Sequence, residues 1–105
     1  MVIIETPIFT RRIQELIPDE EYRLLQIHLV NRPDAGKTIP GGGGLRKLRW
    51  SAGGHRKRGG IRVIYYWLFT RDAILFLFAY PKSEQDDLTA EQLRKIRKVV
   101  EREYL

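Results

Sequence analysis

The sequence predicts an α+β domain in which helices pack against a largely antiparallel β-sheet. Three consecutive segments between Leu45 and Tyr80 have the composition and periodicity of strands, which predicts an antiparallel meander. Apolar residues recur at helical spacing both before and after this run. The expected order is strand, helix, helix, three strands and helix, within a single domain covering residues 1–105.

The first elements are predicted from apolar runs and from the residues that begin or end helices and strands. Val2–Phe9 is predicted as a strand, with Pro7 marking its end or an edge position. A short helix capped by its first residue is predicted over Thr10–Leu16. Pro18–Asn31 is predicted as a second helix, because proline suits the first helical position and the next three residues are acidic. Pro33 then ends it.

A glycine-rich connection, residues 33–44, precedes the meander and is long enough to be a functional loop. Leu45–Ser51 alternates between apolar and basic residues, which predicts a half-buried strand with a basic face. Ile61–Phe69 is rich in β-branched and aromatic residues and is predicted as the next strand. Ala73–Tyr80 is almost wholly apolar, so we expect it in the interior of the sheet.

The C-terminal helix has the clearest start signal in the chain. Thr89 is expected to be its N-cap, and Gln92 completes a capping box. Leu88 and Leu93 are spaced as a hydrophobic staple across that cap. The following apolar positions keep helical spacing, which predicts an amphipathic helix with basic residues on its outer faces.

The positive charge of the chain is concentrated in its middle third. Nine of the 19 basic residues lie between Asp34 and Asp72, where no acidic residue occurs, and all nine glycines lie between Gly36 and Gly60. A local excess of cations on strands and their loops is typical of a face that binds a polyanion. The nine residues are Lys37, Arg46, Lys47, Arg49, Arg56, Lys57, Arg58, Arg62 and Arg71.

Several kinds of site are excluded or disfavoured. The chain has no cysteine, so disulfides and thiolate metal sites are excluded, and a cytoplasmic protein is expected. His28 and His55 lie far apart in different kinds of segment, so no zinc site is expected. We find no phosphate-loop motif, no signal peptide and no apolar run long enough to span a membrane. No metal or cofactor is therefore expected.

The basic residues and tyrosines of the meander are predicted to converge. Lys47 and Arg49 share one face of their strand, Arg62 begins the next strand, and Tyr80 and Lys82 close the third. A ribonuclease without metal needs a group that deprotonates a 2′-hydroxyl, cations around the phosphate and a surface that holds bases. A lysine crowded by other cations can supply the base. A basic strand face is more often only a binding surface, so the residues alone predict a polyanion-binding α+β domain.

Three segments of the chain resemble a known toxin family. They are Gly43–Trp50, Lys57–Trp67 and Tyr80–Thr89, with the patterns Arg-Gly-Gly-x-Arg-x-Ile-Tyr-Tyr and Tyr-x-Lys-x-Glu-x-x-Asp-Leu in the last two. The chain resembles the RelE/ParE toxin superfamily and, more narrowly, the HigB-type toxins of type II toxin–antitoxin modules. The resemblance implies a small toxin that enters the ribosomal A site and cuts translated mRNA by attack of the ribose 2′-hydroxyl, without a metal.

The resemblance also implies partners and catalytic roles. Arg62 would clamp the scissile phosphate, Lys47 and Lys82 would be candidates for base or acid, and Arg49, which cannot be a base at neutral pH, would anchor the backbone. A HigA-like antitoxin with a helix-turn-helix domain would neutralise the toxin, and operator DNA would be contacted only through that antitoxin. The alternative hypotheses are a ParE-like poison of DNA gyrase and a degenerate, inactive toxin.

Further RNA contacts are expected on the basic strand and in the glycine-flanked loop after it. His55 directly precedes three cations, so it is expected to be a phosphate contact more readily than a general base. Relatives of the RelE type stack a tyrosine on a base, but Asp87-Leu88-Thr89 has none at this place. Stacking is therefore expected from Tyr80 or Trp50. The expected RNA-binding residues are Arg46, His55, Arg56, Lys57 and Arg58.

Overall fold

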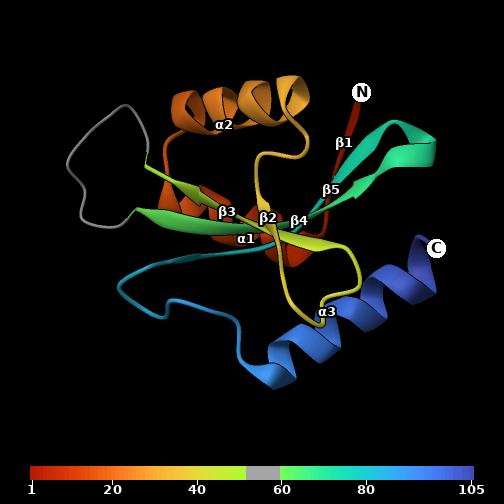
Figure 1. The fold of residues 1–105 in the computed structure, drawn as a ribbon. Coiled ribbons are helices and arrows are strands. Elements are labelled where there is room, and N and C mark those ends of the chain that lie inside the picture. The colour runs from red at the N-terminus through yellow and green to blue at the C-terminus, as the bar shows by residue number, and fades with distance from the viewer. Residues whose placement is uncertain (52–59) are drawn as a thin grey trace.

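A computed structural model describes residues 1–51 and 60–105 of the chain. The predicted α+β class is confirmed, and the predicted order is confirmed apart from one additional short strand, β2 (Figure 1). The elements are β1 (Val2–Glu5), α1 (Pro7–Leu16), α2 (Asp19–Asn31), β2 (Lys37–Thr38), β3 (Leu45–Trp50), β4 (Ile61–Leu68), β5 (Ala73–Pro81) and α3 (Ala90–Glu103).

The strands form one sheet in the order β1-β5-β4-β3-β2. The three longest strands pair antiparallel in sequence, so the predicted meander is confirmed. β2 adds an antiparallel edge beside β3, and β1 pairs in parallel with β5 at the other edge. β5 therefore lies between two strands, which explains its almost wholly apolar sequence.

Helices cover both faces of the sheet and divide the core into two clusters. One cluster packs α1 and α2 against the sheet, with Phe9, Leu25 and Tyr65 among its buried residues. The other packs α3 against the opposite face, with Leu45 and Tyr80 among its buried residues. Figure 1 shows α2 and α3 on opposite sides of the sheet. Within the described residues, we find no helix long and apolar enough to cross a membrane.

The boundary between the first strand and the first helix differs from the prediction. The predicted strand over Val2–Phe9 ends at Glu5, and α1 begins at Pro7 and not at Thr10. The Thr6 hydroxyl accepts a hydrogen bond from the Phe9 backbone amide at 3.2 Å, and so caps the helix. Because proline suits the first helical turn, Pro7 begins the helix directly after this cap.

Two smaller corrections concern turns. Pro18 is the N-cap of α2 and not its first residue. Phe69, predicted as the last residue of a strand, begins a 3₁₀ turn that follows β4. Its side chain is 72% exposed because the chain leaves the sheet there. The capping box of α3 is confirmed, since Thr89 and Gln92 exchange hydrogen bonds at 3.1 and 2.9 Å.

Candidate functional site

Basic residues from the central strands meet on one face of the sheet. Arg49 on β3 is directly opposite Arg62 on β4, which is directly opposite Tyr80 on β5. Lys47 lies two residues before Arg49 and therefore shares its face, because side chains alternate along a strand. This face is the one covered by α3, since Leu45 and Tyr80 pack in the cluster beneath that helix. The predicted convergence of these four residues is thus present in the fold.

An acidic turn between β5 and α3, formed by Asp86 and Asp87, closes against this cluster. The Arg62 guanidinium lies 3.2 Å from the Asp86 carboxylate. The Lys47 ammonium group pairs with the Asp87 carboxylate. The Tyr80 hydroxyl donates a hydrogen bond to the Asp86 backbone carbonyl at 3.2 Å. One residue from each of three neighbouring strands therefore holds the turn in place.

The surroundings of Tyr80 and Asp87 fix their protonation at neutral pH. Burial, reinforced by the negative charge of Asp87, raises the pKa of Tyr80 to about 12, so its phenol keeps its proton. The hydrogen bond and charge of Lys47 lower the pKa of Asp87, so its carboxylate is ionised. A carboxylate contacts Lys47. Lys47 is therefore not surrounded by cations alone, the environment in which the sequence suggested that a lysine could act as the base.

Arg62 and Arg49 differ in exposure although they are neighbours. Arg62 is only 4% exposed and lies inside the cluster, whereas Arg49 is exposed. Lys82 is also exposed, and its backbone amide donates to the Gly60 carbonyl at 3.1 Å. That bond extends the pairing of β4 and β5 beyond their ends. Lys82 consequently lies near the end of the sheet at which Arg62 begins β4.

Arg46 does not join the cluster. Its guanidinium donates to the carbonyl oxygens of Gly36 at 2.8 Å and Asp34 at 3.3 Å. These contacts hold the connection that leads into β2. As the neighbour of Lys47 on the same strand, Arg46 points to the opposite face of the sheet.

Neither of the two residues predicted to stack on a base presents its ring on the open surface of the cluster. Tyr80 is fully buried. Trp50 packs against the core cluster on the α1 and α2 side, with its ring 5.7 Å from the ring of His28. Because Arg49 and Trp50 are consecutive on a strand, they face opposite sides. Neither ring can stack on a base at this cluster as the chain is folded here.

A groove beside β2 extends the cluster towards the edge of the sheet. Its volume is about 400 Å³, and it joins basic side chains to apolar walls. Such a combination suits a nucleotide, because cations hold the phosphate and an apolar wall contacts the base. The lining residues include Lys37, Ile39, Pro40, Lys47, Arg49 and Asp87.

The acidic turn is the feature of the candidate site that the sequence prediction missed. Asp86 and Asp87 lie within the segment Tyr80–Thr89, where the available signal was an acidic pair four residues after Lys82 at the end of a strand. The predicted contacts of His55, Arg56, Lys57 and Arg58 fall outside the described residues. They stay predictions.

Comparison with known protein families identifies the family to which the chain belongs. A family model described as "RelE toxin of RelE / RelB toxin-antitoxin system" matches residues 1–104 of the chain. That match covers every element of the fold and all the residues of the basic cluster. The chain therefore belongs to the RelE toxin family.

Proposed function

We propose that this RelE-family toxin is an endoribonuclease of the HigB type, which enters the ribosomal A site and cuts translated mRNA without a metal. The observation that carries the proposal is the row of Arg49, Arg62 and Tyr80 across three strands, with Lys47 beside it. Cations and a hydrogen-bond donor arranged on a rigid sheet can neutralise the charge that develops on a phosphate during strand cleavage.

The roles of the cations are those that the resemblance to HigB-type toxins implies. Arg62 clamps the scissile phosphate, and Arg49 holds the neighbouring backbone. Lys47 or Lys82 removes the proton of the 2′-hydroxyl, whose oxygen then attacks the phosphorus. The bond from phosphorus to the 5′-oxygen breaks, which leaves a cyclic phosphate and a 5′-hydroxyl that takes up a proton. Tyr80 keeps its proton at neutral pH, so it serves as a donor and not as a base.

Substrate binding in this proposal requires the acidic turn to move. The carboxylates of Asp86 and Asp87 contact the cations that a phosphate would contact. Two anions cannot share these cations without repulsion, so RNA must displace at least one carboxylate. The exposed position of both aspartates makes such a displacement sterically feasible.

Membership of the RelE toxin family supports an antitoxin as a partner. A HigA-like antitoxin with a helix-turn-helix domain neutralises the toxin in the cytoplasm, and operator DNA is contacted only through the antitoxin. His55, Arg56, Lys57 and Arg58, which lie outside the described residues, bind the RNA backbone and add a salt-dependent contribution to affinity.

The test is to induce the chain in cells and map the 5′ ends of mRNA. We expect new mRNA 5′ ends inside translated frames. These ends should disappear when translation initiation is blocked, and they should be absent when the Arg62→Ala variant is induced instead. Arg71→Ala is the matched control, because Arg71 is an exposed arginine at the opposite end of β4 and should leave cleavage intact.

Thermal unfolding of both purified variants separates a lost contact from a lost fold. Cleavage by a folded Arg62→Ala protein would refute the assignment of Arg62. Growth arrest with intact mRNA and a DNA-damage response would favour a gyrase poison, and no arrest at all would indicate a degenerate toxin.

A further inference from the structure

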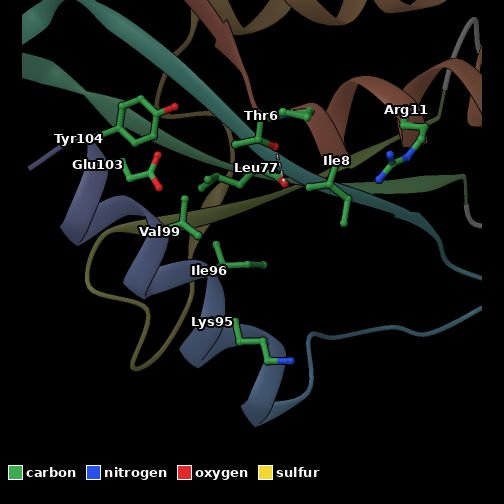
Figure 2. A pocket seen from close by; sticks show the side chains of 10 residues that line it. Thr6, Ile8, Arg11, Leu77, Lys95, Ile96, Val99, Glu103 and Tyr104 are labelled. Atoms are coloured by element: carbon green, nitrogen blue, oxygen red, sulfur yellow. Dashed lines mark hydrogen bonds between the residues drawn. The ribbon is translucent and has the colours of Figure 1, made fainter.

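An apolar groove lies between the start of α1 and α3, away from the basic cluster. Its volume is about 430 Å³. Figure 2 shows Ile8 of α1 facing Ile96 and Val99 of α3, with Leu77 of β5 between them. Ile8 is 45% exposed and Val99 is 36% exposed, so both present apolar surface to solvent. None of the basic cluster residues lines this groove.

The groove continues along α3. A second cavity of about 220 Å³ is also lined by Ile8, Leu77 and Ile96, so the two are adjoining parts of one depression. The lining residues on α3 run from Gln92 to Glu103. That stretch corresponds to about 16 Å at the rise of an α-helix, enough to receive about three turns of a partner helix or a short extended segment.

The charges on the rim indicate what kind of segment would fit. Arg11 on α1 and Lys95 on α3 stand on opposite walls of the groove (Figure 2). Arg11 is exposed, and the Lys95 side chain is 74% exposed, 3.8 Å from Glu91. Glu103 is the acidic residue on the rim. An apolar floor with one cationic side chain on each wall favours a partner segment that alternates apolar and acidic residues.

We propose that this groove is the docking site of the antitoxin, which places apolar side chains between Ile8 and Val99 and carboxylates beside Arg11 and Lys95. The inference rests on the proposed antitoxin partner and deepens it by naming the surface. Because the groove shares no residue with the basic cluster, antitoxin binding and RNA cleavage are separable by mutation.

The first test compares two valines in helices. Val99→Glu places a charge in the groove, and Val30→Glu is its control, because Val30 lies on α2 outside the groove and is 39% exposed. The probe is the product of the gene adjoining that of the toxin, and calorimetry gives its Kd. We expect Val99→Glu to weaken binding by about a hundredfold, and Val30→Glu to leave it within about threefold.

A second pair keeps the test independent of packing within α3. Lys95→Glu reverses a rim charge, and Lys98→Glu makes the same change on α3 outside the groove lining. We expect about tenfold weaker binding for Lys95→Glu only, restored by an Asp→Lys or Glu→Lys change in the partner.

The outcomes separate this inference from the proposed activity. Equal binding by all four variants, or no binding by the wild-type chain, would overturn the groove as the antitoxin site. So would a dimer of the chain that Val99→Glu converts to a monomer, since the occupant would then be a second copy. Growth arrest by Val99→Glu that the antitoxin no longer prevents would support the inference. If the wild-type chain did not cleave RNA, the proposed ribonuclease activity would be refuted, and the inference about the groove would be unaffected.

Discussion

Tyr65 illustrates how one side chain positions the edge of the groove beside β2. Its ring is fully buried at the centre of the sheet. Its hydroxyl accepts a hydrogen bond from the Gly36 amide at 2.8 Å and donates one to the Pro33 carbonyl at 2.7 Å. A Cβ at Gly36 would lie 2.7 Å from the ring, so only glycine allows this approach. The connection before β2, and with it Lys37, is held against the sheet by these bonds.

Removing that hydroxyl should therefore destabilise the protein. In Tyr65→Phe the Gly36 amide keeps its buried position and loses its acceptor, so we expect unfolding to become easier by about 1–3 kcal/mol. Urea denaturation measures the free energy of unfolding. Tyr66→Phe is the control, because Tyr66 is the neighbouring tyrosine on β4 and is only partly buried. An equal change in both variants would show that these two bonds contribute little.

The elements that sequence could predict are those with local signals. The capping box identified the start of α3, and alternation identified the basic face of β3. The boundary at Thr6 was misplaced because the apolar run across Pro7 also fits a strand. β2 was missed because a two-residue strand has almost no pattern of its own and is defined by its pairing with β3.

The same distinction explains which part of the site was predictable. Lys47, Arg49, Arg62 and Tyr80 converge because strands of a meander pair in order and side chains alternate, and both rules can be read from sequence. The acidic turn could not be predicted in this way. The path of the turn depends on tertiary contacts with three strands. The sequence of a loop has no periodicity from which such contacts can be predicted.

The cap of α3 carries a prediction at the scale of the element. Thr89→Ala removes the acceptor for the Gln92 amide, so we expect the free energy of unfolding to fall by about 1 kcal/mol. Thr70→Ala is the control, since Thr70 is an exposed threonine in the 3₁₀ turn. Urea denaturation of the two variants checks this. If Thr89→Ala were as stable as the control, water would satisfy the helix end as well as the side chain does.

At the scale of the whole molecule, the proposed RNA site and the proposed antitoxin groove are made of different residues. The basic cluster lies where β3, β4 and β5 meet the acidic turn, and the apolar groove lies between α1 and α3. The net charge of +6 attracts a polyanion over a distance, while the acidic turn stabilises the cluster in the absence of one. If the proposed function is correct, the contacts that hold the acidic turn in the free toxin are the ones that RNA has to replace, so stability and function compete at this site.

Neutralising the acidic turn should therefore increase the affinity for RNA. Asp86→Asn with Asp87→Asn keeps the size of both side chains and removes two negative charges from the cations. We expect a short oligonucleotide with 2′-deoxy substitution at the cleavage site to bind about fivefold more tightly, with the gain disappearing at high salt. Fluorescence anisotropy measures this affinity, and Asp19→Asn on the exposed start of α2 is the control.

The pH dependence of binding provides an independent check of the same idea. Because Lys47 holds the pKa of Asp87 below its usual range, the wild-type ion pair persists through neutral and mildly acidic pH. It is lost only as the pH falls through that lowered pKa, which lies below the usual range of an aspartate side chain. The affinities of the wild-type protein and of the double variant should therefore differ at pH 7 and converge in acid. Equal affinities at pH 7 would show that the carboxylates do not compete with phosphate for Arg62 and Lys47.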